Sequence, residues 1–336
     1  MQIINKKRSE IAKLTIVTPI FNEAENFDSY IEKLGTVFSE AAGLKVSVVL
    51  VDDGSFDESW QKMQKLSEND SRFLAIRLSR NFGAHTALAA AFDHVPLDAD
   101  IVATLACDLQ DPAETILDFI KIWRGGADIV WGARRSRHDG IWRRVGSQVL
   151  VKLLRRYAMP KNSKFQTGSF FLIDRIVLDC MRQFREHGRV TFALVAWTGF
   201  DQAIVQYDRK ARATGRSRWG YMQMLNTAYD VLIGFSPIPA KALTILGFLM
   251  LGGSVLLCVN LVLSWLFFNV QPGWTGLMGT MTLCFGLLFV MIGISFEYLY
   301  RIFTEAKQRP LYFVAARSGN VSERPLECVP QHWPTP

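Results

Sequence analysis

Acidic and amide side chains follow three short apolar runs in the first third of the chain, and their types could bind one ligand together. The segments are Pro19-Ile20-Phe21-Asn22-Glu23, Asp52-Asp53-Gly54-Ser55 and Asp108-Leu109-Gln110-Asp111-Pro112. Carboxylates in such positions can accept a hydrogen bond from a sugar or ribose hydroxyl, accept a base N–H, or hold a divalent cation. A single aspartate often caps a helix, but three such segments together indicate a ligand site.

The apolar runs themselves are typical of buried strands. They cover residues 14–18, 46–51, 73–78, 101–106 and 129–131, and between them apolar residues such as Ile31, Leu34 and Phe38 have helical spacing. Alternating strands and helices predict an α/β fold with a Rossmann-like, mostly parallel sheet, whose ligands bind at the carboxyl ends of the strands. The acidic segments lie at those ends. Neither GxGxxG nor GxxxxGK[ST] follows a strand, which disfavours a dinucleotide oxidoreductase or a P-loop NTPase.

A long charge-free block predicts a membrane anchor. No Asp, Glu, Lys or Arg occurs between Lys241 and Glu297. Residues 242–268 and 276–296 can each cross a hydrocarbon core of about 30 Å, and residues 269–275 make the turn. The alternative is a pair of buried helices in a soluble core. Because the turn lacks Lys and Arg while both flanks are basic, we expect a multi-pass protein of the inner (cytoplasmic) membrane with its N-terminal domain in the cytoplasm.

The charge outside that block favours anionic partners. The 336 residues carry 38 Lys and Arg against 31 Asp and Glu, a net charge of +7. The basic residues gather near the apolar spans, so we expect a membrane and not a nucleic acid as partner. Residues 141–157 and 219–235 have the apolar stripe of interfacial helices. Gly279, Gly286 and Gly293 form a small-residue stripe compatible with a homo-oligomer through the membrane helices. The five cysteines form no CxxC pair, which argues against a zinc site.

The segments TPIFNEAEN, VDDGSFD, LSRNFGAHTALAAAF, DLQDP and GARRSR, followed by WTGF and RATGRSRW, resemble the inverting GT-A glycosyltransferases. Within them they are similar to the polyprenyl-phosphate sugar transferases, such as dolichyl-phosphate mannose synthase and bactoprenol glucosyltransferase. The resemblance covers about residues 12–305. It implies a cytoplasmic GT-A domain over residues 1–218, a juxtamembrane amphipathic segment over 219–241, a two-helix transmembrane hairpin over 242–304 and a cytoplasmic tail over 305–336.

The same resemblance implies an activity and a set of site residues. A sugar would pass with inversion from a nucleotide-sugar, expected to be UDP-linked, to an undecaprenyl-type polyprenyl phosphate, for later glycan modification. The residues carried over for the nucleotide-sugar are Pro19, Phe21, Glu23, Asp52, Asp53 and Cys107. Those for Mg²⁺ or Mn²⁺ are Asp108 and Gln110; those for catalysis are Asp108, Arg134 and Arg212. The acceptor phosphate would contact Arg134, Arg212, Ser217 and Arg218.

Two positions depart from the family pattern. Ala106 stands where many relatives have a second acidic residue near the metal, and Ser169 stands where relatives often have a carboxylate. A lipid phosphate is already anionic and attacks without a base, so the second departure is compatible with that acceptor. Two alternatives stay open at this point: a processive or other membrane polysaccharide glycosyltransferase, and a catalytically silent, membrane-tethered scaffold.

Overall fold

The computed structural model describes residues 8, 12–40, 43–108, 110–135, 160, 164, 168–209, 229, 238–268 and 273–319. They belong to two compact units, one formed by Met1–Ala228 with Pro310–Pro336 and the other by Tyr229–Arg309. The predicted interfacial helices, residue 229 apart, and the predicted site residues Arg212, Ser217 and Arg218 lie outside the described residues.

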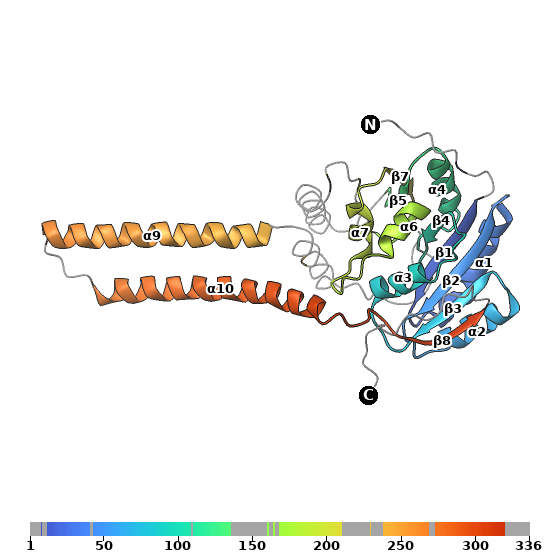
Figure 1. Ribbon diagram of the computed structural model, residues 1–336, viewed down its shortest axis with the longest axis horizontal. Helices are drawn as coiled ribbons and strands as arrows, with labels where there is room; N and C mark the ends of the chain where they lie inside the picture. The colour runs from blue at the N-terminus through green and yellow to red at the C-terminus, as the bar shows by residue number, and fades with distance from the viewer. Residues whose placement is uncertain are drawn as a thin grey trace. The chain divides into compact units, whose positions relative to one another are not determined.

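The first unit is built on an eight-stranded sheet (Figure 1). In chain order its strands are β1 Lys13–Ile20, β2 Lys45–Asp52, β3 Phe73–Leu78, β4 Ile101–Thr104, β5 Ile129–Arg134, β6 Phe171–Asp174, β7 Gln202–Tyr207 and β8 Val314–Gly319. Their order across the sheet is β7-β5-β6-β4-β1-β2-β3-β8. Only β6 and β8 run antiparallel to their neighbours. The expected α/β fold with a mostly parallel sheet is therefore confirmed.

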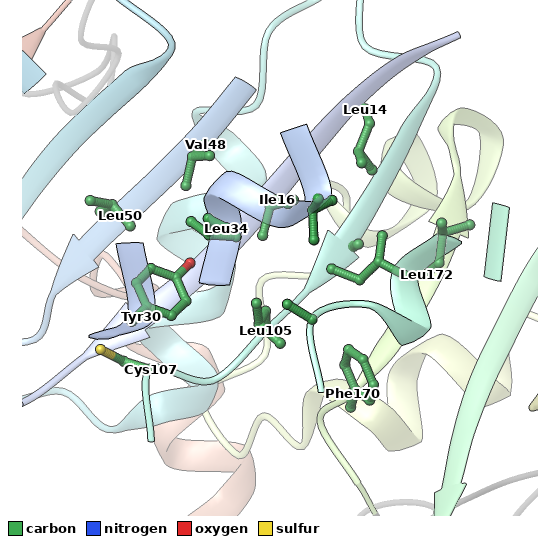
Figure 2. Packing of buried hydrophobic residues seen from close by; sticks show 14 of the residues in the cluster. Leu14, Ile16, Tyr30, Leu34, Val48, Leu50, Leu105, Cys107, Phe170 and Leu172 are labelled. Carbon is green, nitrogen blue, oxygen red and sulfur yellow. The ribbon is translucent and has the colours of Figure 1, made fainter. Parts of the chain in front are cut away.

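Helices cover both faces of this sheet. The helices α1 Ala24–Glu40, α2 Ser59–Asn69 and α4 Thr115–Arg124 share one core with the strands, while α3 Ala84–Asp93, α6 Arg175–Met181 and α7 Thr191–Trp197 pack together away from it. Figure 2 shows that core, where Ile16 and Leu50 of the sheet meet Tyr30 and Leu34 of α1. Burying side chains of this size contributes about 1.5–3 kcal/mol each. The shared core fixes the strands whose ends must position the site.

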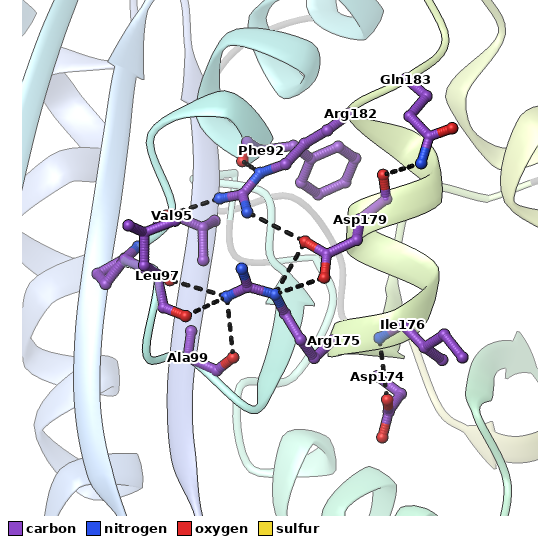
Figure 3. A network of polar contacts seen from close by, with 11 residues as sticks. Phe92, Val95, Leu97, Ala99, Asp174, Arg175, Ile176, Asp179, Arg182 and Gln183 are labelled. Carbon is purple, nitrogen blue, oxygen red and sulfur yellow. Dashed lines mark hydrogen bonds and ion pairs between the residues drawn. The ribbon is translucent and has the colours of Figure 1, made fainter. Parts of the chain in front are cut away.

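Arg175 of α6 and Arg182, which directly follows α6, stabilise the connection between α3 and β4 (Figure 3). Arg175 donates a hydrogen bond to the carbonyl of Leu97 at 2.6 Å, and Arg182 donates one to the carbonyl of Val95 at 2.7 Å. Asp179 accepts hydrogen bonds from both arginines. This network lies at the amino end of β4, so it supports the fold from the side opposite the expected site.

The segment that follows the second unit returns to the sheet as β8, which the sequence did not predict. β8 pairs antiparallel with β3, with Ala75 opposite Ser318. Arg317 lies 2.7 Å from Nε2 of His94, and because a guanidinium can only donate, that nitrogen accepts. Burial lowers the pKa of His94, which keeps the ring neutral for this contact. Both ends of the second unit therefore connect to the first unit.

The second unit consists of the long helices α9 Ile238–Phe268 and α10 Trp274–Ala306. Large apolar side chains are exposed along both, including Phe248 at 70% and Phe289 at 70%. Within the described residues, the segment Leu283–Ala306 is long and apolar enough to cross a membrane, with a mean hydropathy of 1.9. The apolar stretch Lys241–Leu257 of α9 is shorter. One of the two predicted spans thus has support from length and composition, and the second stays a prediction.

Candidate functional site

The loops that follow β1 and β2 are bonded to each other. The N–H of Asn22 donates to Oγ of Ser55 at 2.9 Å, and the N–H of Phe56 donates to Oδ1 of Asn22 at 2.8 Å. The N–H of Glu23 donates to Oγ of Ser59 at 3.0 Å. Asn22 itself has a φ of 53°, a left-handed conformation that asparagine tolerates better than most residues. These bonds fix the segment that carries Phe21 and Glu23.

Asp52 lies at the end of β2 and its side chain is fully buried. Its Oδ1 accepts the N–H of Ser55 at 2.9 Å, and its Oδ2 lies 3.2 Å from Nε of Arg77. Burial raises the pKa of Asp52, and the bonds to Ser55 and the charge of Arg77 oppose that rise. Asp52 therefore holds the turn at residues 52–55 and connects it to the end of β3.

Asp53 holds a second loop, the one between β3 and α3. Its two carboxylate oxygens accept the N–H groups of Phe82 at 2.7 Å and Gly83 at 2.8 Å. Burial raises the pKa of Asp53, and these two N–H groups oppose the rise. In this arrangement Asp53 shapes the loop that borders the carboxyl ends of the strands. Its predicted contact with a nucleotide stays a prediction.

The other residues predicted for the nucleotide lie at the ends of β1 and β4. Pro19 is opposite Val51 in the β1–β2 ladder, and Phe21 follows directly after β1. The side chain of Cys107 lies in the hydrophobic core (Figure 2), so only its backbone can face a ligand. Burial raises the pKa of the Cys107 thiol, and the nearby charges of Glu23 and Asp108 raise it further.

Asp108 and Gln110 provide the oxygen atoms that suit a hard cation. Oδ1 of Asp108 accepts the N–H of Gln110 at 3.2 Å, and both residues follow the end of β4. Among the described residues, no group of three or more His, Cys, Asp or Glu side chains could hold a metal ion. A carboxylate and an amide oxygen fit Mg²⁺ or Mn²⁺ if phosphate oxygens and water complete the coordination, as is common for Mg²⁺.

The structure adds three residues that the sequence analysis did not assign: Asp111, Tyr207 and Arg209. Arg134, at the end of β5, is opposite Tyr207 in the β5–β7 ladder. The hydroxyl of Tyr207 donates a hydrogen bond to Oδ1 of Asp111, and Nε of Arg209 lies 3.6 Å from the same oxygen. Asp111 was visible in the DLQDP segment, but nothing local in the sequence indicates that its partner lies 96 positions away.

The charges of this group favour an anion. Burial lowers the pKa of Arg209, and the positive charge of Arg134 lowers it further. Burial also raises the pKa of Asp111, while hydrogen bonding from Tyr207 and the charges of Arg209 and Arg134 oppose the rise. Arg134 at the end of β5 and Arg209 just beyond β7 thus place two guanidinium groups near Asp111. Arginine pairs of this kind bind phosphate oxygens through charge-assisted hydrogen bonds.

The two positions that depart from the family pattern lie near the end of β4. Oγ1 of Thr104, the last residue of β4, donates a hydrogen bond to the carbonyl of Ser169, whose own side chain is exposed. A carboxylate at position 169 would therefore stand close to the end of β4. Ala106, the other departure, lies two residues beyond the end of β4, between Thr104 and Asp108.

Comparisons with known proteins give one family model and several full-length relatives. The model described as "Glycosyl transferase family 2" matches residues 15–182. An uncharacterised glycosyltransferase of Synechocystis is 33% identical over 94% of this chain and 98% of its own. A bactoprenol glucosyl transferase of Shigella phage SfV is 30% identical over 90% of this chain and 98% of its own. The solved structure of a mannosyltransferase from Pyrobaculum calidifontis, in complex with GDP-Man and Mn²⁺, is 16% identical with a TM-score of 0.43, and the match covers 83% of this chain and 86% of that one.

Proposed function

Because the chain belongs to glycosyl transferase family 2, we propose that it transfers a sugar from a nucleotide-sugar to a polyprenyl phosphate, with inversion, at the cytoplasmic face of a membrane. The chain is a glycosyltransferase with a GT-A-like α/β fold. Membership of a glycosyltransferase family disfavours the alternative that the chain is a catalytically silent, membrane-tethered scaffold. The donor nucleotide, which we expect to be UDP, and the lipid acceptor are the parts of the proposal that need experiment.

The observation that carries the proposal is the arrangement around Asp111: Tyr207, which is opposite Arg134 in the β5–β7 ladder, bonds its carboxylate, and Arg209 lies 3.6 Å from the same oxygen. Both proposed substrates present phosphate: the donor carries a diphosphate and the acceptor a monophosphate. Two arginines at the ends of neighbouring strands, with the carboxylate of Asp108 as a ligand for a cation, complement such a pair of anions better than they complement a neutral sugar hydroxyl. The name of the Shigella phage relative supports a bactoprenol-type lipid, and the segment Leu283–Ala306 supports membrane attachment.

The proposed reaction needs positioning more than proton transfer. One oxygen of the acceptor phosphate attacks the anomeric carbon from the side opposite the diphosphate, and the bond from that carbon to the diphosphate oxygen breaks. The nucleoside diphosphate leaves with the electron pair, and no proton has to be removed from the acceptor. Arg134 and Arg209 hold phosphate oxygens in line and neutralise their charge. A Mg²⁺ or Mn²⁺ ion held by Asp108 and Gln110 would supply further positive charge at the diphosphate.

The test compares two acceptors that differ only in the phosphate. The full-length protein in detergent receives a panel of labelled nucleotide-sugars with either a polyprenyl phosphate or the matching polyprenol, and mass spectrometry identifies the lipid products. We expect a sugar on the phosphate and none on the alcohol. Efficient glycosylation of the alcohol would show that the nucleophile is a hydroxyl, and formation of a polysaccharide without a lipid-linked monosaccharide would favour the processive alternative.

A further inference from the structure

Phe56 is an exposed aromatic side chain at the carboxyl end of β2. Its exposed fraction is 89%, and no other large hydrophobic side chain among the described residues is more exposed. A single exposed phenylalanine is ordinary on a protein surface and needs no explanation by itself. Phe56 differs because its backbone is held in place and because its ring contacts a residue of the proposed nucleotide site.

The backbone of Phe56 belongs to the bonded pair of loops described above. Its N–H donates to Oδ1 of Asn22, while the N–H of Asn22 donates to Oγ of Ser55. The next residue, Asp57, accepts the N–H of Ala24 at 3.1 Å through Oδ2. These bonds connect both sides of position 56 to the loop after β1. The ring of Phe56 therefore cannot reach the core without breaking them, and the loop keeps it in solvent.

The exposed ring forms a corner with Phe21. The two ring centroids are 6.2 Å apart and the ring planes meet at 74°, an edge-to-face contact. A flat aromatic ligand that stacks on the face of one ring also meets the other ring nearly at a right angle. Asp52 and Asp53, at the end of the same strand, place this corner beside the predicted nucleotide contacts.

An exposed phenylalanine at this position could contact a lipid surface or a nucleobase, and the charge of the loop distinguishes these two partners. Asp57 and Glu58 directly follow Phe56, so the tip of the loop carries negative charge. Such a loop is repelled by an anionic bilayer surface and by a diphosphate. A nucleobase is neutral and flat, and stacking on an aromatic side chain suits it.

We propose that Phe56 stacks on the base of the donor nucleotide and, with Phe21, forms the aromatic corner that binds the base. The role rests on the proposed function, because it requires a nucleotide donor. Base–aromatic stacking changes affinity by roughly fivefold to a hundredfold per base. Phe56 contributes that factor to donor binding and takes no part in the bond-breaking step.

The experiment measures binding, so that it does not depend on turnover. Isothermal titration of the full-length protein in detergent, with Mg²⁺ present, compares UDP with ribose 5-diphosphate, which has the phosphates and no base. The variants are Phe56→Ala, Phe56→Trp and the control Leu97→Ala, whose side chain is 53% exposed before β4. Phe56→Ala should weaken UDP binding by roughly fivefold to a hundredfold and leave the baseless ligand unchanged. Phe56→Trp and Leu97→Ala should bind UDP about as the wild type does.

The outcomes separate this role from the proposed function. If the wild type binds neither UDP nor any of the other common nucleoside diphosphates when they are titrated in the same way, the proposed function is wrong and the stacking role is wrong with it. If the wild type binds UDP and Phe56→Ala binds it equally well, only the stacking role is wrong. An equal loss for UDP and for ribose 5-diphosphate would assign the effect to a distorted loop and overturn the proposal. The same conclusion follows if Phe56→Ala instead lowers binding to vesicles that contain anionic lipid while its UDP affinity stays normal.

Discussion

At the scale of single residues, Asp108 and Asp111 lie three positions apart and have different surroundings. The carboxylate of Asp111 accepts a hydrogen bond from Tyr207 and lies near Arg209, so its negative charge interacts with groups of the protein itself. Asp108 accepts the N–H of its neighbour Gln110, and a carboxylate oxygen beside that bond suits a cation. The two carboxylates are therefore expected to respond differently to substitution, one through the metal and the other through the arginine.

The first prediction concerns the metal. Asp108→Asn removes the only charged ligand that we assign to Mg²⁺ or Mn²⁺, so kcat/KM should fall by more than about 100-fold while the fold is kept. Transfer assays over a range of Mg²⁺ and Mn²⁺ concentrations measure the loss, and circular dichroism checks the fold. Asp118→Asn is the matched control, because Asp118 is an exposed aspartate of α4 that pairs with Lys121. Near-normal turnover of Asp108→Asn at saturating metal would refute the assignment.

The second prediction concerns the residue that orients the arginine. Tyr207→Phe leaves half-buried Asp111 without its hydroxyl donor, which should lower the free energy of unfolding by about 1–3 kcal/mol. Because Asp111 can then draw Arg209 away from phosphate, kcat/KM for the lipid should also fall, with donor affinity little changed. Tyr312→Phe is the control, since Tyr312 donates a similar bond to Asp93 at 2.8 Å elsewhere in the domain. If both variants lose the same activity per folded molecule, Tyr207 has no special role at the site.

Single residues also show which parts of the candidate site can be predicted from the sequence. The position of Asp108 could be predicted because it lies shortly after an apolar run that forms a strand, and strand ends meet at one edge of a parallel sheet, whereas Arg134 is indicated only by the family resemblance. Tyr207 and Arg209 could not be predicted. Their place beside Asp111 depends on the β5–β7 pairing, which brings distant segments together without a local pattern.

At the scale of elements, the site depends on loops that are held by strand-end aspartates. Asp53 binds the N–H groups of Phe82 and Gly83, and Gly54 allows the two loops to approach. Gly54 has a φ of 73°, and a Cβ at this position would lie 2.5 Å from the carbonyl carbon of Arg80. A backbone contact that close cannot be relieved by rotating a side chain.

The third prediction follows from that approach. Gly54→Ala should displace residues 80–83, weaken the bonds to Asp53 and lower both stability and donor affinity, with a cost to stability above the about 1 kcal/mol of a positive φ alone. Gly43→Ala is the control, because Gly43 has a φ of 83° and nothing within 4 Å of an added Cβ. Denaturant unfolding and nucleotide titration of both variants provide the comparison. Equal losses of stability would mean that the approach to Arg80 is not important.

Elements also differ in how clearly the sequence predicts them. The five buried strands were predicted close to their observed positions because they are short apolar runs between helical stretches. The strands β6, β7 and β8 were missed. β7 and β8 lie at the two edges of the sheet, and Val314–Gly319 contains too few apolar residues to resemble a buried strand. The pairing of β8 with β3 joins two segments that are separated in the sequence by the whole second unit, so no local pattern indicates it.

At the scale of the whole molecule, β8 constrains the membrane topology. The second unit begins after Ala228 and ends at Arg309, and the chain on both sides of it belongs to the sheet-containing unit. A folded domain lies on one side of a membrane, so a second unit that enters the membrane would have to cross it an even number of times. If the segment Leu283–Ala306 crosses, α9 is the other helix among the described residues of this unit that can bring the chain across in the other direction. We therefore keep the two-span prediction for α9 and α10, although Lys241–Leu257 alone is short for a span.

The last prediction tests this topology directly. In a variant without the five native cysteines, a single cysteine replaces Asp118 of α4, Glu305 near the end of α10, or Gly273 between α9 and α10. Gly273 has an ordinary φ of −64°, and an added Cβ there meets nothing within 4 Å, so a side chain fits. Because positive charge flanks the helices and is absent from the turn, an impermeant maleimide should label only Gly273→Cys on intact spheroplasts. All three cysteines should react after the membrane is opened. Labelling of Glu305→Cys but not Asp118→Cys on intact spheroplasts would mean an odd number of crossings, which pairing of β8 with β3 in one sheet does not allow.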